Sequence, residues 1–155
     1  ITSPILMYLL EGGLPLEGIT VMVQKEVGER LMASPGGKDY GILTLACAYY
    51  AEVEKIVDVG KENFHPVPKV DSMVVRLIPR CREDRLPEKT ERSYFALIKA
   101  GFGMRRKNLL NALASLFAGD KEQVRRFLDE AGIDGGRRAE TLSKEEFFKL
   151  AKLRS

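Results

Sequence analysis

Apolar and polar positions divide the chain into a first part that mixes helices with strands and a second part that is helical throughout. Residues 19–23 are β-branched and almost continuously apolar, which predicts a strand buried on both faces. Residues 40–50 are too densely apolar for a surface element and predict a buried helix. Two further segments, 53–59 and 72–78, predict strands that pair antiparallel, because no helix separates them. This order indicates a piece of an α/β sheet.

From residue 90 onward the apolar residues recur at helical spacing. Tyr94, Ile98 and Phe102 lie four residues apart and predict the buried face of a helix, which Gly101 and Gly103 are expected to break. Further helices are predicted over residues 104–118, 121–131 and 143–153, the last of them opened by a capping box at Ser143 to Glu146.

A charged, proline-marked segment separates the two parts of the chain. We therefore predict an α/β domain over residues 1–80, a linker over 81–89 and a helical domain over 90–155. No internal repeat is visible in the sequence.

Composition excludes several classes of protein. The 45% apolar and 30% charged residues are typical of a globular protein, and the longest apolar run, residues 42–51, is far shorter than the roughly 20 residues of a membrane span. We therefore expect no membrane partner. Cys47 and Cys81 lack metal-ligand spacing, so we expect no metal site, and a reducing cytoplasm fits them best. With His65 as the single histidine, most histidine-based catalytic schemes are excluded within this chain.

The net charge of +3 is unevenly distributed. Residues 1–60 contain four basic and eight acidic residues, whereas residues 61–155 contain 21 basic and 14 acidic ones. Such asymmetry is expected where one part of a protein approaches a polyanion, although a modest basic excess is also common on an ordinary solvated surface.

The string F-H-P-V-P-K-V-D-S at residues 64–72 carries the first candidate chemistry. Pro66 and Pro68 fix their own φ angles and bias the preceding residues toward extended geometry, so Phe64 is expected at the root of a stiff loop. An aromatic ring held in this way suits stacking on a flat ligand such as an unstacked nucleobase. The alternative is that Phe64 simply fills the core.

Three consecutive cations, Arg105, Arg106 and Lys107, fall in the first turn of the helix predicted over residues 104–118. Cations at that end oppose the positive pole of the helix dipole, whereas a bound anion would reverse the sign of the interaction. The free backbone N–H groups and the three basic side chains therefore predict a phosphate site. The alternative is that these side chains extend into water or pair with acidic residues elsewhere.

Four strings together carry a family resemblance. The pattern F-x-P-x-P-x-V-x-S at residues 64–72 resembles the target-base loop of the ribosomal RNA adenine dimethyltransferases, the KsgA type and its erythromycin-resistance relatives. The strings Q-K-E-V at 24–27, F-G-M-R-R-K at 102–107, and G-I-D with R-A-E between 132 and 140 are similar to further segments of the family. They occur in the family's order and at its spacing, so the resemblance covers nearly the whole chain.

The resemblance implies the C-terminal part of a Rossmann-like S-adenosylmethionine-dependent methyltransferase sheet, with an antiparallel strand pair, followed by a small helical domain. Family members dimethylate two adjacent adenosines near the 3′ end of small-subunit rRNA, so the implied partners are that rRNA and the immature small ribosomal subunit. The family's glycine-rich cofactor loop and N-L-P-Y string would lie upstream of Ile1. We therefore expect no cofactor-binding residue in this chain and no activity of the fragment alone.

The resemblance also implies roles for individual residues. Phe64 would stack on the flipped target adenine, and Pro66 and Pro68 would hold its loop rigid. The residues implied to contact the rRNA are Lys69, Arg105, Arg106, Lys107, Asn108 and Asn111.

Two alternatives stay open from the sequence. One is a noncatalytic RNA-binding module that has kept the basic helical domain, and the other is a relative that resembles mitochondrial transcription factors. In either case the half sheet would expose an unpaired edge. We expect an N-terminal half or a second copy of the chain to cover it.

Overall fold

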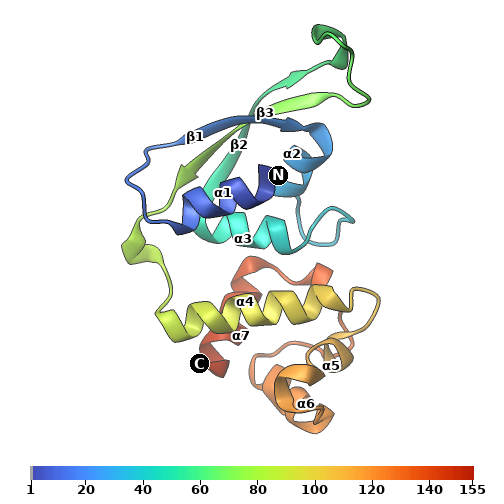
Figure 1. Cartoon of the computed structure of the whole chain (residues 1–155). Coiled ribbons are helices and arrows are strands. Elements are labelled where there is room, and N and C mark those ends of the chain that lie inside the picture. Colours follow the sequence, from blue (N-terminus) through green and yellow to red (C-terminus); the bar gives the residue numbers. More distant parts are fainter. Residues whose placement is uncertain (1) are drawn as a thin grey trace. The chain divides into compact units, whose positions relative to one another are not determined.

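The computed structural model describes residues 2–155, which form two compact units (Figure 1). The first unit runs from the N-terminal end to Ala33 and from Leu43 to Arg85, and the second comprises Ser34–Ile42 and Leu86–Ser155. The boundary near residue 85 lies inside the predicted linker, 81–89. The predicted first domain, 1–80, differs from the first unit because it includes Ser34–Ile42, which packs within the helical unit.

The first unit is built on a sheet that contains, within residues 2–155, the three strands β1 (Ile19–Gln24), β2 (Ala51–Val59) and β3 (Ser72–Pro79). Strand β3 lies between the other two and is antiparallel to both. The predicted antiparallel pairing of the second and third strands is therefore confirmed.

One face of this sheet packs against helices. Helices α1 (Thr2–Glu11) and α3 (Ile42–Tyr50) lie on the same side of the sheet (Figure 1), while α2 (Lys25–Leu31) directly follows β1. The alternate residues Met73, Val75 and Leu77 of β3 are buried, as period-two side-chain alternation requires. The core of the first unit therefore lies between this face and the helices.

The opposite face of the sheet is open in the part of the chain that the structure describes. Met22, Val74 and Val57 lie directly opposite one another across the three strands, so their side chains share a face. Met22 is 52% exposed and Val57 48%, whereas Ile19 and Val23 are buried. The prediction that residues 19–23 are buried on both faces is therefore wrong for the described residues. We call Met22, Val74 and Val57 the apolar row.

Helix α3 confirms the buried helix predicted over residues 40–50, except that it begins at Ile42. Leu45 and Cys47 are almost completely inaccessible. Burial raises the pKa of the Cys47 thiol to about 12, so this side chain acts as an apolar core group and not as a thiolate nucleophile.

The second unit is centred on α4 (Glu88–Gly103), which packs against α7 (Lys144–Arg154). The fully buried ring of Tyr94 stands edge-on to Phe148, with 5.0 Å between the ring centroids. The smaller helices α5 (Leu109–Ala112) and α6 (Lys121–Glu130) complete this unit. None of the helices found in residues 2–155 combines the length and the apolar character needed to cross a bilayer.

The single helix predicted over residues 104–118 is wrong. Residues 104–107 form a turn, α5 is short, and a 3₁₀ helix, Ala114–Phe117, follows it. Asn108 is the N-cap of α5, and its side chain accepts a hydrogen bond from the backbone N–H of Asn111. Asparagine is favoured at helix N-caps, so a new helix begins at Asn108, four residues after the predicted start.

The expectation that Gly101 breaks this helix is wrong. Helix α4 continues through Gly101 and ends at Gly103. A Cβ atom at position 101 would lie 2.8 Å from the Cβ of Ala139, so a glycine here permits close packing of the Ala139 side chain against α4.

Segment Ser34–Ile42 is fixed within the helical unit by Tyr40. The Tyr40 hydroxyl donates to the Leu142 carbonyl at 2.6 Å, and its ring stands edge-on to Phe102 at 6.0 Å. Gly36 N also donates to the Glu140 carbonyl at 2.7 Å. Burial raises the pKa of Tyr40, so its hydroxyl remains a hydrogen-bond donor.

Candidate functional site

The loop between β2 and β3 presents Phe64. It begins with a 3₁₀ helix, Lys61–Asn63, in which the side-chain amide of Asn63 donates to the Gly60 carbonyl at 3.0 Å. Phe64 N then donates to the Lys61 carbonyl at 3.2 Å. The Phe64 backbone is extended, with φ −116° and ψ 150°, as predicted for the root of this loop, and the His65–Pro66 peptide is cis.

The ring of Phe64 is only partly buried, so it does not fill the core. Together with His65, Pro66, Pro68 and Ser72 it lines a shallow pocket of about 340 Å³. The pocket is lined by polar as well as apolar groups and is open to solvent, so a planar ligand can reach the ring.

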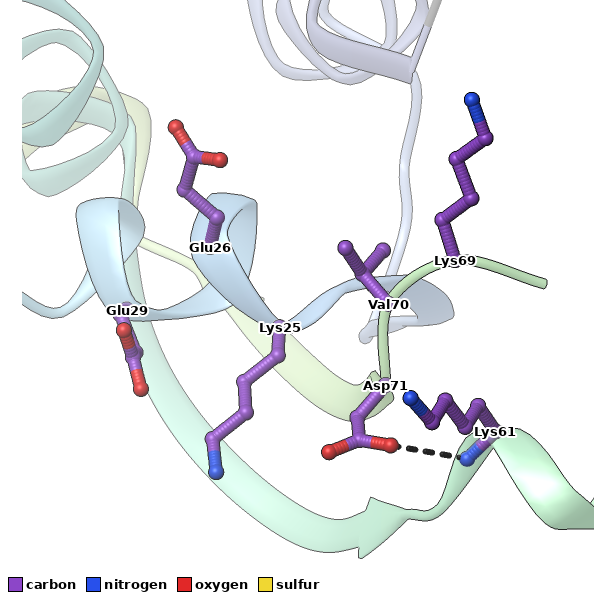
Figure 2. Close-up of a pocket in the computed structure, with 7 residues that line it drawn as sticks. All are labelled: Lys25, Glu26, Glu29, Lys61, Lys69, Val70 and Asp71. Atoms are coloured by element: carbon purple, nitrogen blue, oxygen red, sulfur yellow. Dashed lines mark hydrogen bonds between the residues drawn. The ribbon is translucent and has the colours of Figure 1, made fainter.

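A second pocket, of about 300 Å³, lies at the base of the same loop, and Figure 2 shows the side chains around it. Asp71 joins two elements there. Its carboxylate oxygen Oδ1 accepts a hydrogen bond from Lys61 N at 2.9 Å, and its carbonyl accepts one from Lys25 N at 2.9 Å. The Lys69 side chain extends away from Asp71 in Figure 2 and is exposed. The lining residues are Lys25, Glu26, Glu29, Lys61, Lys69, Val70 and Asp71.

The charges around this second pocket largely balance, because three lysines and three acidic residues line it. Glu26 is already paired with Arg30 at 2.9 Å on the surface of α2. The pocket is therefore not expected to bind anions strongly. The cations at the loop that remain accessible are Lys61 and Lys69, which are both exposed.

The sequence predicted that Arg105 lies in the first turn of a helix. The structure places it instead in the turn of residues 104–107. Its guanidinium Nη2 donates to the Lys38 carbonyl at 2.7 Å and lies 3.3 Å from Glu140 Oε2. The guanidinium carbon is also 5.7 Å from the centroid of the Phe102 ring. The alternative of pairing with an acidic residue elsewhere is therefore correct for Arg105.

The other predicted RNA-contacting residues of this region differ in exposure. Arg106 and Lys107 are exposed. Asn108 and Asn111 bond to each other, since the Asn111 side-chain amide donates to Asn108 Oδ1 at 2.9 Å. These two asparagines therefore stabilise the start of α5.

The structure thus brings Phe64, Pro66, Pro68 and Lys69 together on one loop of the first unit. The segment from Arg105 to Asn111 belongs to the second unit. Sequence reasoning missed Asp71 and Lys61, although Asp71 lies within the string at residues 64–72. An acidic residue just before a strand, opposite the start of a loop, is the signal that could have identified it.

The described residues do not fit an S-adenosylmethionine site. Such a cofactor is expected beside a glycine-rich loop that links a strand to a helix, where backbone N–H groups can reach it. Gly12 and Gly13 instead follow helix α1, and Gly36 and Gly37 follow α2. No glycine-rich strand-to-helix connection occurs within residues 2–155.

Sequence comparison identifies relatives along the whole chain. The profile of the family described as "Ribosomal RNA adenine dimethylase" matches residues 1–154. The chain is 48% identical over 154 residues to ribosomal RNA small subunit methyltransferase A of Bacillus cytotoxicus, and 48% identical over 155 residues to that of Bacillus mycoides. Each alignment covers 97% of this chain and 52% of the relative, so the chain spans about half the length of these proteins.

Solved structures agree with the sequence comparison. The chain matches a dimethyladenosine transferase from Plasmodium falciparum with a TM-score of 0.79 and 26% identity, over 97% of this chain and 61% of that one. It matches the 23S rRNA methyltransferase ErmE with a TM-score of 0.68 and 29% identity, over 99% and 60% of the two chains. The fold is that of the C-terminal part of a methyltransferase, and the chain belongs to the ribosomal RNA adenine dimethylase family.

Proposed function

We propose that this chain is the C-terminal half of an enzyme that dimethylates two adjacent adenosines near the 3′ end of small-subunit rRNA. The observation that carries this proposal is the accessible ring of Phe64 on a hydrogen-bonded, proline-containing loop, in a chain of the dimethylase family. S-adenosylmethionine would supply the methyl group, and the residues that hold it are expected outside this chain. The chain alone is expected to be inactive.

In this proposal the first unit positions the target base. A flipped adenine stacks on Phe64, while Pro66 and Pro68 restrict the loop, so that the exocyclic amine is held in one orientation. Stacking of a base on an aromatic side chain contributes about 1 to 3 kcal/mol. Alignment of the reacting groups can supply a large part of the rate enhancement, and no general base from this chain is required.

The second part of the proposal concerns the RNA backbone. Lys69 next to the Phe64 pocket, and Arg106 and Lys107 on the turn of the helical unit, are exposed cations that can neutralise phosphates. Arg105 supports the turn through its contacts with the Lys38 carbonyl and the Glu140 carboxylate. The proposed partner is the rRNA of the immature small ribosomal subunit in the cytoplasm, whose reducing conditions fit the two free cysteines.

Replacement of Phe64 by alanine in the full-length enzyme tests the role of the ring. Loss of stacking is expected to lower the single-turnover rate of methyl transfer by about 10- to 100-fold. The RNA dissociation constant should change much less, because the phosphate contacts remain. Phe64→Tyr, which keeps the ring, should retain most of the rate, and Val67→Ala, on the same loop, serves as the matched control. An unchanged rate for Phe64→Ala would contradict the proposal.

A further inference from the structure

The loop that carries Phe64 is closed by a hydrogen bond outside the strand ladder. Pairing between β2 and β3 ends with Val59 opposite Ser72. One residue before Ser72, the Asp71 carboxylate accepts the backbone N–H of Lys61 at 2.9 Å. This bond links residues ten positions apart in the chain, so it closes the exposed loop at its base.

A second bond fixes Asp71 itself. The Asp71 carbonyl accepts from Lys25 N, the first residue of α2. The carboxylate is therefore held by a backbone that is attached to the helix following β1, and it does not move freely with the loop. Figure 2 shows Asp71 between these two segments, with its bond to Lys61 drawn as a dashed line.

The same peptide segment leads directly to the aromatic ring. Lys61 N donates to Asp71, while the Lys61 carbonyl accepts from Phe64 N at 3.2 Å. The sequence of contacts is thus Asp71 to Lys61 to Phe64. The Gly60 carbonyl also accepts hydrogen bonds from Asn63, at 3.1 Å from its backbone N–H and at 3.0 Å from its side-chain amide, but both bonds lie within the start of the loop. The bond from Lys61 to Asp71, in contrast, connects the start of the loop to its end.

We propose that Asp71 is a positioning residue, which fixes the Phe64 ring for the target base through its hydrogen bond to Lys61. This inference rests on the proposed function, because it needs Phe64 to be the stacking residue. The essential property of Asp71 is the acceptor oxygen aimed at Lys61 N. Its negative charge among Lys25, Lys61 and Lys69 is secondary.

Two substitutions separate the acceptor from the charge. Asp71→Asn removes the charge but keeps a carbonyl oxygen that can accept from Lys61 N. Asp71→Ala removes both, while the backbone carbonyl that bonds to Lys25 N remains. Glu62→Ala is the matched control, since it removes a carboxylate from the same loop without removing the acceptor for Lys61 N.

The experiment uses the full-length enzyme, with saturating S-adenosylmethionine and rRNA in single-turnover reactions. Asp71→Ala is expected to lower the rate by about 10- to 100-fold, because a misplaced ring misaligns the amine. Asp71→Asn and Glu62→Ala should stay within about threefold of the wild-type rate. The RNA dissociation constant and the thermal midpoint are measured for every variant.

A fluorescent adenine analogue at the target position gives a readout that a loss of stability would not produce. The difference in fluorescence between the complexes of the wild type and Phe64→Ala sets the scale for stacking. On this scale, Asp71→Ala should lie close to Phe64→Ala, and Asp71→Asn close to the wild type.

Each outcome decides between the inferences. If Phe64→Ala is slow but Asp71→Ala reacts like the wild type, the positioning role is overturned and the proposed function stands. If Asp71→Asn is as slow as Asp71→Ala, the charge and not the acceptor matters, and the inference is wrong. If Phe64→Ala reacts like the wild type, the proposed function itself fails.

Discussion

Arg105 and Arg106 are adjacent in the sequence but have different environments. The Arg105 side chain is 38% exposed and contacts Lys38, Glu140 and Phe102. Arg106 is exposed. The sequence could not separate the two arginines, because the polar partners of Arg105, Lys38 and Glu140, lie more than thirty positions away on either side. At Phe64, in contrast, the local proline-containing sequence was enough to predict a non-helical backbone in an accessible loop.

Alanine substitution of each arginine should produce opposite effects. Arg105→Ala is expected to lower the free energy of unfolding by about 1 to 2 kcal/mol, since a carbonyl contact and a partly exposed ion pair are lost. Its effect on the salt dependence of RNA binding should be small. Arg106→Ala should leave the unfolding free energy within about 0.5 kcal/mol and lower the salt slope of RNA binding by about one.

Urea unfolding and RNA titrations at several salt concentrations measure both quantities for the two arginine variants. An unchanged salt slope for Arg106→Ala would remove this residue from the proposed RNA contacts. An unchanged unfolding free energy for Arg105→Ala would show that its contacts do not support the turn.

Helix α7 shows how a short sequence signal defines an element. Ser143 Oγ accepts from Glu146 N at 3.1 Å, and Glu146 Oε1 accepts from Ser143 N at 3.1 Å, which confirms the capping box. Arg137 adds a two-pronged ion pair to the Glu146 carboxylate, at 2.6 and 3.1 Å. The hydrogen bond from Arg137 is the main reason why the pKa of Glu146 lies below its ordinary value. The capping box was predictable from the sequence, whereas its arginine partner was not.

The Arg137–Glu146 pair should make the stability depend on pH. Because the pKa of Glu146 is lower in the folded than in the unfolded state, the pair stabilises the protein above the unfolded value of about 4.5. This stabilisation is lost as the pH falls through the folded pKa. Glu146→Gln is expected to cost about 1 kcal/mol at neutral pH and almost nothing in acid.

Unfolding by urea across this pH range measures the effect of Glu146→Gln, with Glu145→Gln, an exposed residue in the same helical turn, as the control. Equal losses at neutral and acidic pH would contradict the assignment to this ion pair.

The region after α4 shows where helical periodicity misleads. Apolar residues at helical spacing predicted a continuous helix over residues 104–118, but the backbone N–H groups of Leu109 and Leu110 bond elsewhere. Leu109 N donates to the Arg137 carbonyl at 2.8 Å, and Leu110 N donates to the Gly135 carbonyl at 3.3 Å. These tertiary partners satisfy donors that a continuous helix would have used. Burial of the leucines was foreseeable, but the partners of their backbones were not.

For the whole molecule, the sequence indicated the two kinds of structure but not how the chain divides between them. Segment Ser34–Ile42 belongs to the helical unit through a hydrogen bond between residues 102 positions apart, from Tyr40 to Leu142. Its sequence starts with S-P-G-G, which predicts only a loop. Long-range contacts of this kind leave no periodic pattern in a single sequence.

The helical unit should therefore be less stable without segment Ser34–Ile42. Residues 86–155 expressed alone lack the buried Tyr40 ring and are expected to unfold at a lower temperature than the same unit in the complete chain. Tyr40→Ala in the complete chain should cost about 3 to 5 kcal/mol, as is usual for loss of a buried aromatic side chain. Calorimetry measures both effects, and the exposed Tyr8 provides a control substitution. Equal midpoints with and without the segment would contradict this expectation.

The apolar row on the open sheet face should make the isolated chain associate. Met22 and Val57 are about half exposed, next to a β1 edge that has no strand partner within residues 2–155. Sedimentation of the chain alone is expected to show species larger than a monomer, and the double substitution of Met22 and Val57 by lysine should reduce them. Thr20→Lys, at an exposed position on the same face, is the control. A clean wild-type monomer would refute this prediction.

The path of the chain through the two units also limits how relatives can be recombined. The polypeptide enters the helical unit at Ser34, leaves it after Ile42 and returns at Leu86. A chimaera joined only at the linker would therefore take Tyr40 from one parent and its contacts Phe102 and Leu142 from the other. A functional exchange between two family members therefore needs three junctions, and the short insert must come from the same parent as the C-terminal helices.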